Sequence, residues 1–210
     1  MGLYSAAAAV IEQPAEPLLV VISGPSGVGK DTVLDRMKQR GLPFHFVVTA
    51  TTRPRRPGEV EGEDYFFVGE QEFLDMIEKG ELIEHALVYN DHKGVPRQQI
   101  REAMESGQDV VMRVDVQGAK TIQSLAPEAL LIFLTARDED ELSRRLRKRR
   151  TESEADLKLR LEAAKEELGY LDIFDYVVLN ADSTVETAVD TILAIIEAEH
   201  HRINPRRVNL

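Results

Sequence analysis

The sequence predicts an α/β fold of three layers, in which a central, mostly parallel sheet is flanked by helices. Three observations support this prediction. Short apolar, β-branched segments alternate along the chain with segments of helical periodicity, as expected for repeated βαβ units. A glycine-rich turn joins the first strand directly to the first helix. A β-rich stretch at 49–95 interrupts the alternation and is expected to form an inserted lobe.

The first half of the chain contains the start of the sheet and the predicted lobe. Leu18–Ser23 is a continuous apolar run, which is typical of a buried parallel strand. Asp31–Arg40 has helical spacing of apolar residues, and Gly41 ends it. Residues 51–65 are polar and rich in proline and glycine, so they are expected to be loop. Further strands are predicted at Phe44–Val48, Tyr65–Val68 and Glu81–Tyr89, with a helix at Glu70–Lys79.

The second half returns to alternating strands and helices. Its predicted strands are Asp109–Val114, Leu130–Leu134 and Tyr176–Leu179. Its predicted helices are Arg97–Ser106, Gly118–Leu125, a long charged region at Asp138–Gly169 and an amphipathic helix at Val185–Glu199. Residues 1–17 are expected to be a disordered or weakly helical leader, and 199–210 a C-terminal tail.

Composition excludes several classes of protein. The chain has 210 residues, of which 43% are apolar, enough for one domain with a sizeable core. It has no cysteine, which excludes a disulfide framework, thiolate catalysis and cysteine-based metal sites. The net charge of −11 argues against general binding to nucleic acid or an anionic membrane. We therefore expect a soluble, cytoplasmic protein without a nucleic-acid or membrane partner.

The glycine-rich turn has the G-x-x-x-x-G-K pattern of a phosphate-binding loop (P-loop). It follows a predicted strand and opens a predicted helix, which is the context that gives this pattern its meaning. Glycines let backbone N–H groups converge on phosphate oxygens at a helix N-terminus, and Lys30 would reach the β- and γ-phosphates. A turn without a ligand is the disfavoured alternative. The ATP-binding residues predicted here are Gly24, Pro25, Ser26, Gly27, Val28, Gly29, Lys30, Asp31 and Thr32.

One position departs from the usual pattern of this loop. Asp31 follows the lysine, where a serine or threonine usually ligates magnesium, and Thr32 comes one residue later. Thr32 is expected to take the metal role, directly or through a water. A carboxylate beside phosphates is repulsive, so Asp31 is placed at the rim.

A cationic segment follows the second predicted strand. Three arginines, Arg53, Arg55 and Arg56, occur within four residues that also include a proline. Arginine suits bidentate capture of phosphate. On composition alone a solvated basic turn is equally compatible with this segment.

Four segments together resemble guanylate kinase, a P-loop nucleoside monophosphate kinase. They are GPSGVGK at 24–30, TTRPRRPGEVEGEDYFF at 51–67, ELIEHA at 81–86 and VDVQGA at 114–119. The resemblance runs in order over residues 18–198. It implies transfer of the γ-phosphate of ATP to GMP, with dGMP as a second acceptor and Mg²⁺ bound with ATP. It also implies a core at 18–48, 96–136 and 158–198, a GMP-binding lobe at 49–95 and a lid at 137–157.

The resemblance implies a set of acceptor residues. Carboxylates such as Glu84 can accept together from N1–H and N2–H₂ of guanine, a donor pair that adenine lacks. Phosphate contacts are implied for Arg53, Arg56 and Tyr65, and base contacts for Thr49, Glu59, Glu84 and Asp115. Asp115 could also orient magnesium-bound water. Lys93 and Val95 stand where relatives often carry tyrosine and a hydroxyl residue, so they are the weakest acceptor assignments, and Arg113 stands where many carry an acid.

Residues 144–150 contain six cations in seven positions. Taken alone, this cluster fits a nucleic-acid site or a solvated helix face, because acidic residues flank it. The resemblance implies a lid that closes over ATP, with Arg145, Arg149 and Arg160 on the transferred group and Asn180 at the adenine. With Lys30 and Arg53, these three arginines are the predicted catalytic set.

Two other classes stay open. One is a catalytically silent guanylate-kinase-like module that binds proteins, against which the intact P-loop argues. The other is a kinase for a different monophosphate, against which the predicted carboxylates around the base argue. Either a monomer or a homodimer fits the sequence.

Overall fold

The central sheet is parallel throughout the part of the chain that the structure describes. The structure is a computed structural model that describes residues 15–88, 91–148 and 154–210. Within these residues, the spatial strand order is β2-β7-β1-β8-β9, and each neighbouring pair is parallel. The strands are β1 (Leu19–Ser23), β2 (His45–Phe46), β7 (Val110–Arg113), β8 (Leu130–Thr135) and β9 (Tyr176–Leu179). The predicted fold class is confirmed.

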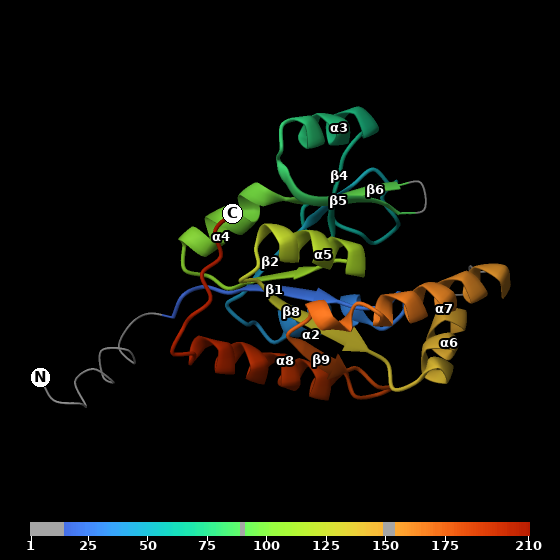
Figure 1. Ribbon diagram of the computed structural model, residues 1–210. Coiled ribbons are helices and arrows are strands. Elements are labelled where there is room, and N and C mark those ends of the chain that lie inside the picture. The colour runs from blue at the N-terminus through green and yellow to red at the C-terminus, as the bar shows by residue number, and fades with distance from the viewer. Residues whose placement is uncertain (1–14, 89–90, 149–153) are drawn as a thin grey trace, which may run out of the picture.

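Helices cover both faces of this sheet (Figure 1). Side chains alternate along β1, since Val20 and Ile22 join one apolar cluster while Leu19 and Val21 join the other. The first cluster packs against α2 and α8, and the second against α4 and α5. These helices are α2 (Lys30–Gln39), α8 (Val185–His200), α4 (Arg97–Glu105) and α5 (Val116–Leu125). The result is the predicted three-layer arrangement.

A second sheet forms the inserted lobe, above the central sheet in Figure 1. Its strand order is β4-β3-β6-β5, in which β3 and β4 are parallel and the other pairs antiparallel. The elements are β3 (Thr49–Thr51), β4 (Tyr65–Phe67), α3 (Glu70–Glu78), β5 (Leu82–Val88) and β6 (Asp91–Pro96). The prediction missed β3 and β6, and it made β2 too long.

Within its described residues, the charged region predicted as one helical stretch contains two helices. They are α6 (Glu139–Lys148) and α7 (Glu154–Leu168). Leu142, Leu146 and Ala164 form a small buried cluster between them. Arg149 lies outside the described residues, so its predicted place in the lid is not described.

The C-terminal residues return to the core. After α8, Val208 and Leu210 pack against the second apolar cluster, and Arg206 is buried. The chain ends beside α4 (Figure 1), where Arg101 Nη2 donates to the Leu210 carbonyl at 3.2 Å. Among the described residues, no helix combines the length and hydropathy that crossing a membrane requires. Most of the predicted leader lies outside the described residues, and the predicted domain boundaries stay predictions.

Candidate active site

The glycine-rich loop connects β1 to α2 and packs tightly against β8. Gly24 has φ 135°, and a Cβ added there would lie 2.1 Å from the backbone oxygen of Leu134. Gly29, the residue before α2, has φ 95°, and its added Cβ would lie 2.6 Å from Nδ2 of Asn180. L side chains rarely adopt such φ values, and here the space is also filled. Glycine is therefore required at both ends of the loop.

Lys30 begins α2 and folds back over the loop. Its ammonium donates to the carbonyl oxygen of Gly24 and, at 3.2 Å, to that of Pro25. Burial lowers the pKa of Lys30, while the carboxylates of Glu167, Asp31 and Asp115 oppose this effect. The lysine thus lies among backbone oxygens and acids, as suits a cation that binds phosphate oxygens when a nucleotide is present.

Residues from three other segments contact the loop. Arg145 of α6 donates from Nη1 to the Val28 carbonyl at 3.0 Å, and from Nη2 to Glu141 at 2.6 Å. Arg160 of α7 donates to Ser26 Oγ at 3.2 Å. Asn180, which follows β9, donates to the Val28 carbonyl at 2.9 Å. The structure therefore brings three residues that the sequence assigned to ATP onto one loop.

Asn180 has one polar atom without a hydrogen-bond partner among the described residues. Its side-chain oxygen Oδ1 is buried and has no partner in the structure. A buried acceptor without a partner costs free energy. The protein encloses this oxygen, and the predicted contact with adenine stays a prediction.

The arginine segment of the lobe is ordered around Glu59. Arg53 donates from Nη1 and Nη2 to the two carboxylate oxygens of Glu59, at 2.8 and 2.7 Å. The backbone N–H of Arg56 donates to the same carboxylate at 2.8 Å, while its side chain is exposed. These contacts lower the pKa of Glu59 to about 2, chiefly through the Arg53 hydrogen bond. The segment is a turn held together by internal hydrogen bonds. This argues against the alternative of a solvated basic loop.

Three cations surround the ring of Tyr65. Arg53, Arg113 and Lys93 lie 5.0, 5.5 and 6.0 Å from its centroid. Arg113 also donates from Nη2 to the Tyr65 hydroxyl at 3.0 Å and forms an ion pair with Asp31. In the sequence, Arg113 stands out only as a departure from the family pattern, and no pattern there predicts its place in the site. Asp31 is exposed as expected for a rim position, but its partner was missed.

Glu84 is the buried acid of the lobe. It is 8% exposed on β5, and its carboxyl group packs against Gly118, where an added Cβ would lie 3.1 Å from Cδ. Burial, with a smaller contribution from Asp115, raises the pKa of Glu84 to about 7. Asp115 caps α5, and its side chain accepts from the Gly118 N–H at 2.7 Å. The two predicted acids therefore meet at the start of α5.

The other predicted residues have simpler surroundings. Thr49 is opposite Tyr65 in the β3–β4 pair, and Thr32 is exposed in the first turn of α2. Val95 is 1% exposed and belongs to the second apolar cluster. A core position explains an apolar side chain there, so we leave Val95 out of the proposed acceptor site.

Two acids near the loop were not predicted. Glu141 is 3% exposed and accepts from Arg145 and from the backbone N–H of Arg137, the latter at 3.0 Å. Burial raises the pKa of Glu167 of α7 above its ordinary value, although the nearby charge of Lys30 partly opposes this. Both lie in the charged region, where sequence patterning alone does not separate buried acids from solvated ones.

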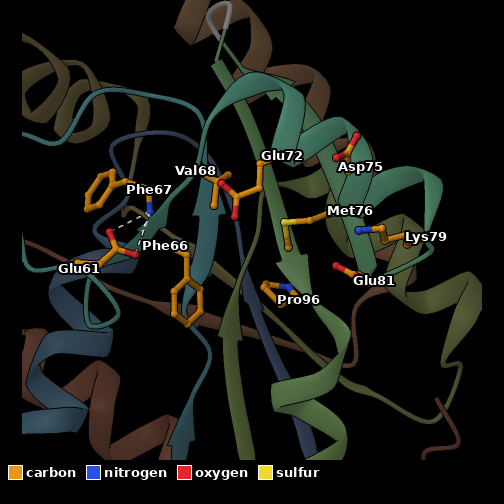
Figure 2. A pocket seen from close by; sticks show the side chains of 10 residues that line it. All are labelled: Glu61, Phe66, Phe67, Val68, Glu72, Asp75, Met76, Lys79, Glu81 and Pro96. Carbon is orange, nitrogen blue, oxygen red and sulfur yellow. Dashed lines mark hydrogen bonds between the residues drawn. The ribbon is translucent and has the colours of Figure 1, made fainter.

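A hollow of about 630 Å³ lies on the lobe (Figure 2), and the ring of one lining residue, Phe67, is 5.5 Å from the Arg53 guanidinium. Acidic and apolar side chains of the lobe line it, including Phe66, Glu72 and Met76. None of its lining residues belongs to the predicted nucleotide sites. The candidate active site is therefore the cationic region between the loop and Tyr65, not this hollow.

Comparisons with known proteins agree with one family. The family model for guanylate kinase matches residues 16–199. Guanylate kinase 2, chloroplastic/mitochondrial, of Oryza sativa subsp. japonica is 50% identical over 198 residues, which are 94% of this chain and 70% of that protein. The guanylate kinase of Lactobacillus johnsonii is 43% identical, with 91% of this chain and 93% of that protein covered. The crystal structure of guanylate kinase from Anaplasma phagocytophilum matches with a TM-score of 0.73 and 33% identity, covering 90% of this chain and 89% of that one.

Proposed function

This chain belongs to the guanylate kinase family, and on that premise we propose that it transfers the γ-phosphate of ATP to GMP, giving ADP and GDP. The observation that carries the proposal is the pairing of two cationic centres. Lys30, Arg145 and Arg160 surround the glycine-rich loop, and Arg53 lies over the Tyr65 ring in the lobe. Two polyanionic nucleotides need two such centres that face each other. We include dGMP as a second acceptor.

On the donor side, the loop amides and Lys30 hold the phosphates of ATP. Arg145 and Arg160 already contact the loop, through Val28 and Ser26. Both guanidinium groups are assigned to the transferred phosphate. Arg149 is assigned the same role from the family resemblance, and Asn180 is assigned to the adenine.

On the acceptor side, Arg53, Arg56 and Tyr65 hold the GMP phosphate. Glu84 and Asp115 meet at the start of α5, with Gly118 between them, and Thr49 and Glu59 complete the base side. The Glu84 carboxylate accepts from N1–H and N2–H₂ of guanine. Adenine lacks this donor pair and would leave a buried acid unpaired, which explains the selection of guanine.

The chemistry requires no nucleophilic side chain. An oxygen of the GMP phosphate attacks the γ-phosphorus of ATP in line, the bond to the β–γ bridging oxygen breaks, and ADP leaves with that electron pair. Negative charge spreads over the transferred group, so catalysis consists of positioning and of cations around that group. A helical lid that brings arginines to the site also excludes water, which would otherwise accept the phosphate.

The residues around the loop fit a magnesium ion that arrives with ATP. Thr32 would supply a hydroxyl and Asp115 a carboxylate, directly or through a water, and both are hard oxygen ligands that Mg²⁺ prefers. No group of three or more acidic or histidine side chains within the described ranges could hold a metal by itself. When bound, Mg²⁺ would neutralise charge on the β- and γ-phosphates.

The cellular location and the partners of the enzyme follow from its composition and its substrates. We infer a cytoplasmic enzyme of purine nucleotide metabolism that acts on free nucleotides, either as a monomer or as a homodimer. The cysteine-free composition and the net charge of −11 support this setting.

A substrate panel tests the function. The purified protein with Mg·ATP should form ADP with GMP and dGMP, and not with AMP or UMP. Activity with AMP or UMP, or its absence with GMP, would contradict the proposal. A protein-binding module without catalysis would give no ADP with any monophosphate, which separates that second candidate from the first.

A further inference from the structure

Arg113 lies between the two halves of the proposed site, at the end of β7. In the sheet it is opposite Ile22 of β1, the strand that leads into the glycine-rich loop. Ligands of open α/β folds bind outside the carboxyl ends of the strands, which is where Arg113 stands. Its side chain is 22% exposed, so the guanidinium is mostly enclosed by neighbouring groups.

The guanidinium joins a residue of the core to a residue of the lobe. Nη1 donates to the carboxylate of Asp31, the residue directly after Lys30. Nη2 donates to the hydroxyl oxygen of Tyr65 at 3.0 Å. A guanidinium has five N–H donors, so these two bonds leave others for a further oxygen acceptor. Arg113 is thus within reach of both nucleotide sites.

The surroundings of Tyr65 suit a phosphate dianion. Arg53, Lys93 and Arg113 all lie within 6.0 Å of the ring centroid. Arg53 and Arg113 are paired with Glu59 and Asp31. Each guanidinium nevertheless has further N–H donors, and Lys93 adds a third cation, so an anion at this ring is attracted. The Tyr65 hydroxyl accepts from Arg113 and therefore keeps its own proton available to donate to a phosphate oxygen.

We propose that Arg113 is a further phosphate-binding residue, which donates to the phosphate of the acceptor nucleotide beside Tyr65. Asp31 is the positioning residue that holds the guanidinium there. The inference rests on the proposed placement of the GMP phosphate at Arg53 and Tyr65. It also accounts for an aspartate after Lys30, because the ion pair with Arg113 neutralises a carboxylate that would otherwise repel the nucleotide phosphates.

Calorimetric binding of GMP and of guanosine, without ATP, separates a phosphate contact from a structural role. Arg113→Ala is expected to weaken GMP binding by about 10- to 100-fold, the usual effect of losing a charged hydrogen bond. Guanosine has no phosphate, so its affinity is expected to stay within about twofold. Arg113→Gln keeps much of the side-chain bulk and should give the same result. The control is Arg101→Ala on α4, which removes an equal charge from an exposed position.

A second substitution tests the role of Asp31. Without Arg113, Asp31 is an uncompensated carboxylate beside the phosphate. Asp31→Asn is therefore expected to improve GMP binding in the Arg113→Ala protein, and to weaken it in the wild type, where Asp31 holds the Arg113 guanidinium in place.

Three results would overturn the inference. They are GMP affinity that Arg113→Ala leaves unchanged, equal weakening of GMP and guanosine, and additive effects of the two substitutions. Failure of the proposed function looks different, because the wild-type protein itself would then bind GMP no more tightly than AMP.

Discussion

The Arg53 side chain is fixed before any substrate arrives. Its two hydrogen bonds to Glu59 and its position over the rings of Tyr65 and Phe67 hold the guanidinium in one orientation, with 10% of the side chain exposed. A preorganised cation loses little conformational freedom when phosphate binds. Arg53→Ala is therefore expected to reduce kcat/KM for GMP by about 10²- to 10³-fold, equivalent to about 3–4 kcal/mol. Steady-state kinetics with a coupled ADP assay measure this change.

The same loop supplies the control for that prediction. Arg55 is two residues away and exposed, and it is not assigned to the site. Arg55→Ala removes an equal charge and should change kcat/KM for GMP by less than about threefold, as expected of an exposed cation. If both substitutions had the same effect, Arg53 would act only through the general charge of the loop.

Glu84 gives the site a dependence on pH. Burial and Asp115 raise its pKa to about 7, so near pH 6.5 much of the unliganded protein carries a neutral carboxyl there. The N–H groups of guanine favour the carboxylate, and binding should therefore release protons. Calorimetry in two buffers of different ionisation enthalpy should show this release near pH 6–6.5 and its loss above about pH 8. The KM for GMP should rise as the pH falls below about 7.

Guanosine and one substitution isolate the contribution of Glu84. The phosphate of GMP itself titrates near pH 6, whereas guanosine carries no phosphate. Proton release with guanosine that persists in Glu84→Gln would assign it to another group. The raised pKa also means that the unliganded fold binds a proton that the unfolded chain releases. Glu84 therefore lowers the stability of the unliganded fold as pH rises from about 4.5 to about 7.

At the scale of elements, the junction of β1 with its loop depends on close contact with β8. Gly24 combines φ 135° with an added Cβ only 2.1 Å from the Leu134 carbonyl oxygen, which is backbone and cannot rotate away. Gly24→Ala is expected to destabilise the fold by about 3 kcal/mol or more, through overlap as well as strain. Denaturant unfolding monitored by circular dichroism measures the free energy.

Gly41 is a control position that distinguishes steric overlap of an added Cβ from backbone strain. It has φ 65°, and an added Cβ there meets nothing within 4 Å. Gly41→Ala therefore adds only conformational strain, of about 1 kcal/mol. Equal losses of stability in the two variants would mean that contact with β8 contributes nothing at Gly24.

The elements that the sequence predicted are those that carry their own pattern. β1 can be predicted from its continuous apolar run, and α2 from the helical spacing of its apolar residues. β6, in contrast, contains Gly94 within the strand and ends at Pro96, two residues that rarely occur inside strands. Its Gly94 is required because an added Cβ would lie 2.6 Å from Leu82 and 2.9 Å from Phe73. Only pairing with β3 and β5 makes this segment a strand, and pairing is not visible in a local pattern.

The residues of the candidate site divide in the same way, into those that a sequence pattern predicts and those that only the tertiary structure brings together. Lys30 and its loop follow from spacing, and most other assignments from the family resemblance. Arg113 was visible at the end of a predicted strand, but nothing in the sequence places Asp31 and Tyr65 around it. Those contacts depend on how the lobe lies against the core, which is a property of tertiary structure.

At the scale of the whole molecule, the C-terminal segment ties three parts of the core together. Arg206 donates to Glu199 of α8 at 2.7 Å, to Asp175 before β9 at 2.9 Å and to the Ala129 carbonyl before β8 at 3.2 Å. Tyr176 donates its hydroxyl proton to the other oxygen of Glu199, at 2.7 Å. The last residues are thus part of the folded unit rather than a detached tail.

Removing Arg206 should therefore weaken the whole fold. Arg206→Ala removes the nearer of two cations from Glu199, which is 3% exposed, and leaves only the half-exposed Arg202 at 3.3 Å. A broken buried pair typically costs about 3–5 kcal/mol, so a loss near the lower end of that range is expected. The neighbouring Arg207 pairs with Glu16 at 3.2 Å, but that pair is exposed, so Arg207→Ala should cost less than about 1 kcal/mol. Free energies of unfolding at pH 7 measure both.

The pH dependence of that cost identifies Glu199 as the partner. Burial alone would raise the pKa of Glu199, but the hydrogen bonds from Arg206 and Tyr176 lower it below its ordinary value of 4.5. A lowered pKa stabilises the fold above the pKa of the unfolded chain, and this stabilisation disappears as pH falls through the folded value. The cost of Arg206→Ala should therefore be largest near pH 7 and shrink below about pH 4.5, since protonated Glu199 no longer needs a cation. A cost that stayed constant over this range would mean that Arg206 stabilises the fold by packing alone.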